Sequence, residues 1–472
     1  MMTDKRDFKV KKAETPVKAV IEVPGSKSIT NRALLISALS FDHTKKNGES
    51  EISGNNMDRT ESHEKRSRLS RILFSDDSRV FIKALQDLGF GVSADETSYC
   101  AEITGPSRDS MVSISETASL KDVPGICVGS AGTAARFLTA LLAFSEGEYF
   151  IDASEQMKKR PMLPLFEALT KLGAKFIFAE KEGFLPARVK GIFTNNGGLL
   201  SDTAVVDSDA STQFLSALLM MAPIIANRTG APFYIRVTGS RAQGSYVKMT
   251  LKVMKDFGID TGFDPNENIF TILPTPGYKA RDYEIEPDVS AACYFYAAAA
   301  ITGGEMIVKG VHSDSCQGDI RFLDILSEMG CSKEDTPEGI KIAAPADGIL
   351  HGVSVDMKDF SDQTMTLAAI APFCDSPTEI SGIGHIRGQE SDRIHAVATE
   401  LGRMGLWVEE GDSSLKIYPG TPKPAKIETY DDHRMAMAFS LIGLRTEGIV
   451  IKNYKCCRKT FEDYFETLDS II

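Results

Sequence analysis

One stretch near the N-terminus combines residue types that bind anions. Residues 24–32 read Pro-Gly-Ser-Lys-Ser-Ile-Thr-Asn-Arg, and the apolar run after them predicts a helix that begins near Ser28. The first turn of a helix carries free N–H groups and the positive end of the helix dipole. With Lys27 and Arg32 beside it, this turn suits phosphate or carboxylate. It is not a Walker A loop, because Ser26 stands where that motif has glycine. The alternative is an ordinary capped helix with two solvated cations.

Polar motifs of this kind recur directly before other expected helices. They are Gly129–Thr133, Lys158–Pro161, Ser208–Gln213, Asp288–Ser290, Gln317–Asp319, Ser361–Thr364, Gln389–Arg393, Asp431–Arg434 and Arg458–Thr460. If the helices run roughly parallel, their N-termini converge and their dipoles add over a region rich in Arg and Lys. The motifs therefore predict a region that binds anionic ligands.

Two kinds of helical segment alternate behind these motifs. The first kind is apolar almost all round, which indicates a buried helix: 33–40, 136–144, 213–223, 293–301, 364–373 and 435–444. The second kind is amphipathic and mostly ends in a capping glycine: 80–89, 161–173, 247–258, 320–330, 393–405 and 461–472. The glycines recur roughly every 70–85 residues, so we expect six α/β repeats, grouped as two globular halves of three.

Composition excludes several classes of protein. The chain has 472 residues, 42% of them hydrophobic, 25% charged, and a net charge of −12. Length and composition predict a globular protein of two or three domains, and the acidic balance argues against sequence-independent nucleic-acid binding. No apolar run suits a membrane span or a secretory signal. Eight cysteines and seven histidines show no metal-ligand spacing, so we expect reduced thiols, no metal and a cytoplasmic location.

One segment, residues 43–71, does not fit the repeats. It has no aromatic residue, few aliphatic residues and charges of both signs. We interpret it as a poorly ordered surface insertion, with a docking role as the alternative.

Taken together, these motifs resemble the enolpyruvyl transferases, and within them the branch that acts on shikimate 3-phosphate. The residues that carry the resemblance are Pro24–Ser28 with Asn31 and Arg32, Ala131–Ala134 with Arg136, Lys159–Met162, Ser211–Phe214, Asp362, Glu390–Arg393, Tyr430–Met437 and Lys459–Phe461. They span nearly the whole chain outside the insertion. Each motif alone is weak, whereas all of them in this order are specific.

The resemblance implies a fold and a reaction. The fold would be a two-domain inside-out α/β barrel of six βαβαββ repeats. One domain would comprise residues 25–285, and the other residues 1–24 with 286–472. The enzyme would transfer the enolpyruvyl group of phosphoenolpyruvate to the 5-hydroxyl of shikimate 3-phosphate and release phosphate, in a cleft between the domains that closes on substrate. We expect a stand-alone monomer that uses no cofactor.

The resemblance also assigns residues to each substrate. Phosphoenolpyruvate would be bound by Lys27, Gly132, Thr133, Arg160, Gln213, Arg393, His433, Arg434 and Lys459. Shikimate 3-phosphate would be bound by Lys27, Ser28, Arg32, Ser211, Thr212, Gln213, Tyr246, Asp362 and Gln389. Both substrates are multiply anionic, which suits arginine forks and helix N-termini. Glycine at 132 implies inhibition by glyphosate.

Catalysis needs a base for the 5-hydroxyl and an acid for the methylene carbon, and elimination reverses these roles. The resemblance assigns this work to Asp362 and Glu390, with Lys27 assisting proton transfer. Other interpretations stay open for single residues. Asp362 alone resembles a helix N-cap, Glu390 alone a first-turn acid, and His433 a packed core histidine. Asp288-Val289-Ser290 we interpret as a cap, with a function possible.

Three positions depart from the family pattern. Gln389 stands where many members have lysine, Gln243 precedes Tyr246 where serine is frequent, and Phe137 replaces a proline. Two rival functions stay open. One is the sister activity on UDP-N-acetylglucosamine, which relies on a loop cysteine and a different acceptor site. The other is a catalytically silent protein that only binds ligands.

Overall fold

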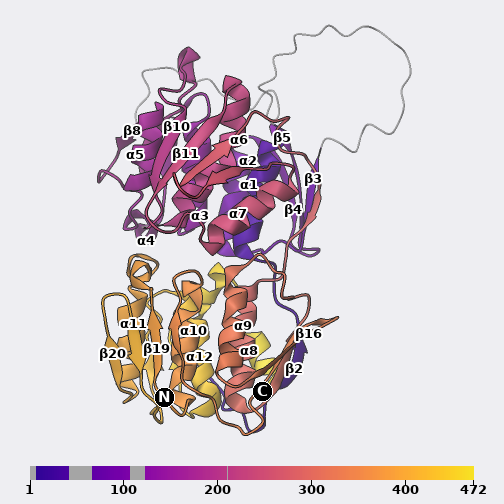
Figure 1. Cartoon of the computed structure of the whole chain (residues 1–472), viewed down its shortest axis with the longest axis vertical. Coiled ribbons are helices and arrows are strands. Elements are labelled where there is room, and N and C mark those ends of the chain that lie inside the picture. Colours follow the sequence, from indigo (N-terminus) through magenta and orange to yellow (C-terminus); the bar gives the residue numbers. More distant parts are fainter. Residues whose placement is uncertain (1–6, 42–65, 107–122, 210) are drawn as a thin grey trace, which may run out of the picture. The chain divides into compact units, whose positions relative to one another are not determined.

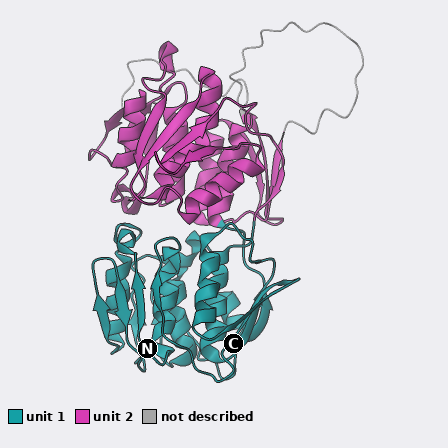
Figure 2. Ribbon diagram, viewed as in Figure 1, with its two compact units in different colours: residues 1–26, 286–472 teal, residues 27–285 magenta. Residues whose placement is uncertain are grey.

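The computed structural model describes residues 7–41, 66–106, 123–209 and 211–472. The chain divides into two compact units (Figure 2). Unit 1 comprises residues 1–26 and 286–472, and unit 2 comprises residues 27–285.

The described residues of unit 2 form three four-stranded sheets. Its last repeat runs β10 (Thr203–Asp207), α6 (Thr212–Thr229), β11 (Phe233–Thr238), α7 (Ser245–Asp256), β12 (Gly262–Asp264) and β13 (Ile269–Ile272). β10 pairs with β11 in parallel, and β13 lies antiparallel to both β11 and β12. The repeat therefore has the order βαβαββ.

The other two repeats of unit 2 have the same pairing order. The middle one comprises β6 (Gly125–Cys127), α3 (Gly132–Ala143), β7 (Glu148–Asp152), α4 (Glu155–Lys158), α5 (Leu163–Leu172), β8 (Lys175–Phe178) and β9 (Ala187–Lys190). The first comprises α1 (Lys27–Leu39), β3 (Ser67–Ser70), α2 (Asp76–Asp87), β4 (Phe90–Asp95) and β5 (Cys100–Pro106), with β14 (Asp282–Glu284) as its first strand.

The first two repeats of unit 1 have this order, whereas the third has a three-stranded sheet, and N-terminal strands belong to the first and the third. Its first repeat comprises β2 (Lys18–Ile21), α8 (Val289–Thr302), β15 (Glu305–Val308), α9 (Phe322–Glu328), β16 (Ser332–Thr336) and β17 (Gly339–Ala343). The second comprises β18 (Ser354–Asp356), α10 (Thr364–Ile370), β19 (Thr378–Ser381), α11 (Arg393–Arg403), β20 (Val408–Glu410) and β21 (Leu415–Ile417). The third comprises β22 (Lys426–Ile427), α12 (His433–Arg445), β23 (Val450–Ile451) and α13 (Tyr464–Ser470), with β1 (Phe8–Lys9) antiparallel to β23.

The helices that the sequence predicts to be buried form the centre of each unit. In unit 2, α3 contacts α1 and α6, and in unit 1, α8, α10 and α12 contact one another, as Figure 1 shows for the orange and yellow helices. Every residue of α3 is buried. The predicted α/β fold of six small repeats is confirmed. Among the described residues, no helix has the length and apolar character needed to cross a membrane.

The structure corrects the predicted insertion. Residues 67–70 are not part of it, because they form β3, which pairs with both β5 and β14. Within β3, Ser67 and Leu69 are buried while Arg68 is exposed. A strand with one aliphatic residue has too weak an apolar signal to be distinguished from a polar loop. Residues 43–65 of the predicted insertion lie outside the described residues.

Several predicted helix boundaries are also wrong. The ranges predicted as 320–330 and 364–373 each include part of a short 3₁₀ helix, η3 (Gly318–Arg321) and η5 (Ala371–Phe373). Three more 3₁₀ helices lie before predicted ranges: η4 (Ser361–Gln363), η6 (Gly384–Gly388) and η7 (Tyr454–Lys459). η5 contains Pro372, which cannot continue α10 with regular hydrogen bonds. The last helix begins at Tyr464 rather than at 461. At Gly173 the predicted cap is present, with φ at 118°.

Candidate active site

The predicted anion-binding stretch forms the start of α1 in unit 2. The helix begins at Lys27, one residue before the expected Ser28. The Lys27 ammonium lies 3.4 Å from the Asp77 carboxylate, which belongs to the first turn of α2. Both side chains are largely buried. Asp77 was missed from the sequence, because an acid in the first turn of a helix is common and carries no signal of a distant partner.

Arg32 lies inside unit 2 and joins three helices. Its side chain is 1% exposed. Its guanidinium donates to the hydroxyl of Thr250 at 2.7 Å, to the carbonyl of Ser28 at 2.8 Å and to the carbonyl of Tyr246 at 3.3 Å. The ring of Phe137 lies under it, 5.4 Å from Cζ. Phe137, one of the three departures from the family pattern, therefore lies inside α3 without interrupting that helix. The hydrogen bonds of Arg32 hold α1 against α7.

Gly132 is the first residue of α3 and lies against two arginines. A Cβ atom placed on it would be 2.7 Å from Arg136 Nη1 and 2.8 Å from Arg160 Nη1. Only glycine leaves the two guanidinium groups in these positions. The neighbouring Thr133 accepts a hydrogen bond from Asn31 at 2.6 Å, which ties the starts of α1 and α3 together.

Ser211, Thr212 and Gln213 begin α6. The Ser211 hydroxyl caps the helix by accepting from the backbone N–H of Gln213 at 3.2 Å. Oε1 of Gln213 is buried and has no hydrogen-bond partner among the described residues. A buried amide oxygen without a donor is unfavourable, so Gln213 is suited to accept a hydrogen bond from a ligand.

In unit 1, Asp362 lies between two arginines rather than capping a helix. It belongs to η4, and its carboxylate is 3.1 Å from Arg393 Nη1 and 2.7 Å from Arg434 Nη2. The N-cap interpretation of Asp362 is therefore wrong. Arg393 also donates to the side-chain oxygen of Gln389, so Gln389 serves here as a neutral acceptor.

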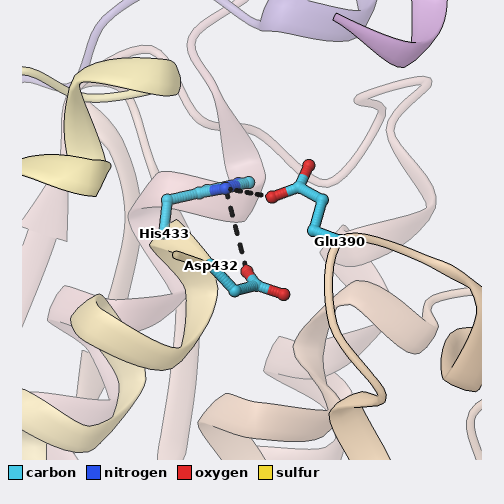
Figure 3. A group of neighbouring side chains, drawn as sticks. All are labelled: Glu390, Asp432 and His433. Carbon is cyan, nitrogen blue, oxygen red and sulfur yellow. Dashed lines mark hydrogen bonds and ion pairs between the residues drawn. The ribbon is translucent and has the colours of Figure 1, made fainter. Parts of the chain in front are cut away.

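Glu390 contacts two groups that carry or can carry positive charge. Its carboxylate lies 2.9 Å from His433 Nδ1 (Figure 3) and 3.0 Å from Lys459 Nζ. Burial favours protonation of Glu390, but Lys459 and His433 outweigh it and hold its pKa well below the ordinary value. α11 begins only at Arg393, so Glu390 is not a first-turn acid. His433 is buried, as a core histidine would be, but it is also hydrogen-bonded to Glu390.

Asp432 organises this cluster and was given no role from the sequence. Its carboxylate is fully buried and lies 2.8 Å from Arg393 Nε, and it caps α12 by accepting from the backbone N–H of Arg434 at 2.9 Å. Burial raises the pKa of Asp432, but Arg393 outweighs burial and the net shift is downward. The only sequence feature that could have indicated this role is the position of Asp432 directly before a buried helix, where Asp commonly acts as a cap.

Glu390, Asp432 and His433 have ligand atoms within 4.8 Å of one another, an arrangement that could hold a metal ion. Their charges are already compensated, since Glu390 pairs with Lys459 and Asp432 pairs with Arg393. A divalent cation would have to displace or approach these two buried cations. The donor set therefore fits an ion-pair network better than a metal centre.

Comparison with known proteins identifies the family. The family model described as EPSP synthase (3-phosphoshikimate 1-carboxyvinyltransferase) matches residues 62–468. The chain is 41% identical over 450 residues to the 3-phosphoshikimate 1-carboxyvinyltransferase of Nostoc punctiforme, covering 95% of each chain. The chain belongs to the EPSP synthase family. The enzyme of the same name from Trichormus variabilis is also 41% identical over 450 residues.

A solved structure supports the fold of the EPSP synthase family for this chain. EPSP synthase from Acinetobacter baumannii superposes with a TM-score of 0.73 at 21% identity, covering 98% of both chains. At this identity the likeness concerns the fold alone. The predicted site residues fall into two sets, one in each unit. Unit 2 holds Lys27, Ser28, Arg32, Gly132, Thr133, Arg160, Ser211, Thr212, Gln213 and Tyr246, and unit 1 holds Asp362, Gln389, Glu390, Arg393, His433, Arg434 and Lys459.

Proposed function

We propose that the protein is a 3-phosphoshikimate 1-carboxyvinyltransferase. It transfers the enolpyruvyl group of phosphoenolpyruvate to the 5-hydroxyl of shikimate 3-phosphate and releases inorganic phosphate. Membership of the EPSP synthase family supports the reaction. The observation that carries the proposal is the unit 1 cluster, in which Asp362 and Glu390 are each held against two groups that can carry positive charge. Such a cluster supplies both proton transfer and anion binding.

We propose the following division of residues. Lys27, Gly132, Thr133, Arg160, Gln213, Arg393, His433, Arg434 and Lys459 bind phosphoenolpyruvate. Lys27, Ser28, Arg32, Ser211, Thr212, Gln213, Tyr246, Asp362 and Gln389 bind shikimate 3-phosphate. The density of cations in both sets supports this division, because each substrate carries a phosphate and a carboxylate. The two units are proposed to be the two domains, each with three repeats, and each of the two sets of residues draws on both units.

In the addition step, the 5-hydroxyl oxygen forms a bond to C2 of phosphoenolpyruvate, its proton passes to a base, and a proton is added to the methylene carbon. In the elimination step, that carbon loses a proton, the C2–phosphate oxygen bond breaks and phosphate leaves. Since the pKa of Glu390 is lowered, Glu390 begins as a carboxylate, and His433 and Lys459 are the adjacent groups that can carry protons. General acid–base catalysis contributes on the order of 10²–10⁴-fold.

We further propose that the protein works in the cytoplasm as a monomer and needs no cofactor. Glyphosate is expected to inhibit it in competition with phosphoenolpyruvate, because Gly132 leaves space beside Arg136 and Arg160. Full activity at high glyphosate concentration would reject this expectation.

The test measures phosphate release with phosphoenolpyruvate and shikimate 3-phosphate, each alone and together. Release is expected only with both substrates. Glu390→Gln is expected to reduce kcat at least about 100-fold through loss of the base. Glu409→Gln is the matched control, since Glu409 lies exposed on β20 and contacts Tyr418. Release with UDP-N-acetylglucosamine instead would assign the sister activity. Substrate binding without release would identify a silent binding protein.

A further inference from the structure

The segment that leads into α12 has an unusual backbone. Tyr430 and Asp431 are adjacent and both have a φ of 55°, in the left-handed region that favours glycine. Aspartate enters this region more readily than most residues, because its short side chain can hydrogen-bond locally, whereas the region is unfavourable for tyrosine. The next residues are Asp432, which caps α12, and His433, which contacts Glu390 (Figure 3). The turn at 430–431 therefore sets where α12 begins.

A buried carboxylate holds this segment in place. Glu400 lies in α11, and its side chain is fully buried. One of its oxygens accepts a hydrogen bond from the Tyr430 hydroxyl at 2.9 Å, and the other accepts from the backbone N–H of Glu428 at 3.2 Å. Arg403 donates to both oxygens at 2.9 and 3.0 Å and supplies the counter-charge. Burial and the Glu400 carboxylate raise the pKa of Tyr430 to about 12, so its hydroxyl keeps the proton that it donates.

The same helix contacts the segment at a second point. Arg393, the first residue of α11, donates from Nε to the Asp432 carboxylate at 2.8 Å. Arg393 and Glu400 are seven residues apart, which places them on one face of the helix, about two turns from each other. From another element, Asn453 donates to the Asp431 carboxylate at 3.1 Å. α11 therefore holds the chain both at the turn and at the cap of α12.

We propose that Glu400 is a positioning residue of the proposed reaction. Its carboxylate holds the left-handed turn through Tyr430, and the turn fixes the start of α12, from which His433 and Arg434 extend into the unit 1 cluster. Without this hydrogen bond the turn can relax to an ordinary φ and displace both side chains. A displacement of about 1 Å is enough to cost about 100-fold in rate. The inference rests on the proposed function, because it assigns Glu400 to the same reaction.

The first test compares two variants of the full-length protein by steady-state kinetics of phosphate release. Tyr430→Phe removes only the hydroxyl, and Glu400→Gln removes the charge and one of the two acceptor oxygens. Tyr430→Phe is expected to lower kcat/KM for phosphoenolpyruvate about 10-fold, and Glu400→Gln about 100-fold. KM is expected to rise while kcat falls, because binding and proton-transfer groups are displaced together. A smaller folded fraction would instead lower kcat and leave KM unchanged.

Tyr418→Phe is the matched control. The Tyr418 hydroxyl donates to the Glu409 carboxylate at 2.7 Å, so this variant also removes one hydrogen bond between a tyrosine and a glutamate of unit 1. Its kcat and KM are expected to stay within about twofold of the parent values.

A rescue variant tests the backbone directly. Tyr430→Gly is introduced into the Glu400→Gln background, since glycine adopts a positive φ without steric cost. The double variant is expected to regain about 3-fold in kcat/KM over Glu400→Gln alone, because the turn no longer needs to be held. A double variant as impaired as Glu400→Gln would overturn the role assigned to the turn.

Hydrogen exchange without ligand separates this inference from the proposed function. In Tyr430→Phe and Glu400→Gln, exchange is expected to become faster in residues 428–436 and to stay unchanged in α10. A parent protein that releases no phosphate would reject the proposed function, whereas unchanged exchange in both variants would reject the hold of Glu400 on the turn. Faster exchange with unchanged kcat and KM would overturn the positioning role. If Glu400→Gln does not fold, Tyr430→Phe decides each of these points.

Discussion

At the scale of single residues, the charge of Glu390 depends on its two neighbours. Burial by itself would favour the neutral acid. Lys459 at 3.0 Å and His433 at 2.9 Å reverse that preference and lower the pKa of Glu390. A group with a lowered pKa stays ionised until the pH falls through that pKa. The carboxylate is therefore present as a base at neutral pH.

Lys459→Met tests this dependence. Removal of the ammonium is expected to raise the pKa of Glu390, so the acid limb of kcat/KM should move to higher pH. The profile is measured between about pH 5 and pH 9. Lys455→Met is the control, because Lys455 is an exposed residue of the same 3₁₀ helix, η7. If the activity of Lys459→Met falls equally at every pH, Lys459 binds substrate without tuning Glu390.

The sequence predicted some of these residues and missed others for a physical reason. Asp362 and Glu390 were found because they stand in motifs, and the structure ties both into one network through Arg393, Asp432 and His433. Asp432 had no assigned role, because the helix-capping interpretation of an Asp before a helix is sufficient by itself. Its second contact, with Arg393, joins residues 39 positions apart. Pairing over such a separation is not visible in local patterns.

At the scale of elements, the twelve helical segments were predictable, whereas the short 3₁₀ helices that precede some of them were not. Apolar periodicity identifies α3 and α11 because burial repeats along them. It does not mark η4 or η7, where Asp362 and Lys459 lie. A 3₁₀ helix of a few residues has no extended apolar face. The positions nearest the chemistry were therefore the ones that periodicity placed least accurately.

Asp319 connects η3, η4 and α8, and its charge allows a test of stability against pH. From η3, its carboxylate accepts from Gln363 of η4 at 2.8 Å and from the Ser290 hydroxyl of α8. Burial, with a further contribution from Asp362, raises the pKa of Asp319 from 3.8 to about 6. An acid with a raised pKa binds a proton more readily when folded. It therefore lowers stability as pH rises from 3.8 to about 6, and the full penalty persists above that range.

Asp319→Asn keeps an oxygen acceptor for Gln363 and removes the charge. The variant is expected to be more stable than the parent at pH 8, by on the order of 2 kcal/mol. The gain should vanish below the unfolded pKa of 3.8. Denaturant unfolding at both pH values measures the difference. Asp314→Asn is the control, since Asp314 is exposed and close in sequence. An equal loss of stability at both pH values would show that hydrogen-bond geometry outweighs charge.

At the scale of the whole chain, three repeats contain a strand from a distant part of the sequence. β14 pairs with β3 across more than 200 residues, β2 pairs with β15 across nearly 290 residues, and β1 pairs with β23 across more than 440 residues. The capping glycines predicted six repeats, and the resemblance implied that the N-terminal strand joins residues 286–472. That β14 completes the first sheet was not predicted, because strand partners depend on non-local packing.

The N-terminal strands β1 and β2 belong to sheets of unit 1. The stability of unit 1 therefore depends on residues 8–21. Val10, Val17 and Ile21 belong to the core of unit 1. Burial of three such side chains contributes about 5–8 kcal/mol, which is comparable to the total stability of a domain.

A chain that begins at Val23 is therefore expected to lose the fold of unit 1 and keep that of unit 2. Hydrogen exchange should show lost protection in α8 and β15 and retained protection in α3 and α6. A chain that begins at Asp7 keeps both strands and serves as the control. Unchanged protection of β15 in the shorter chain would mean that unit 1 folds without its N-terminal strands.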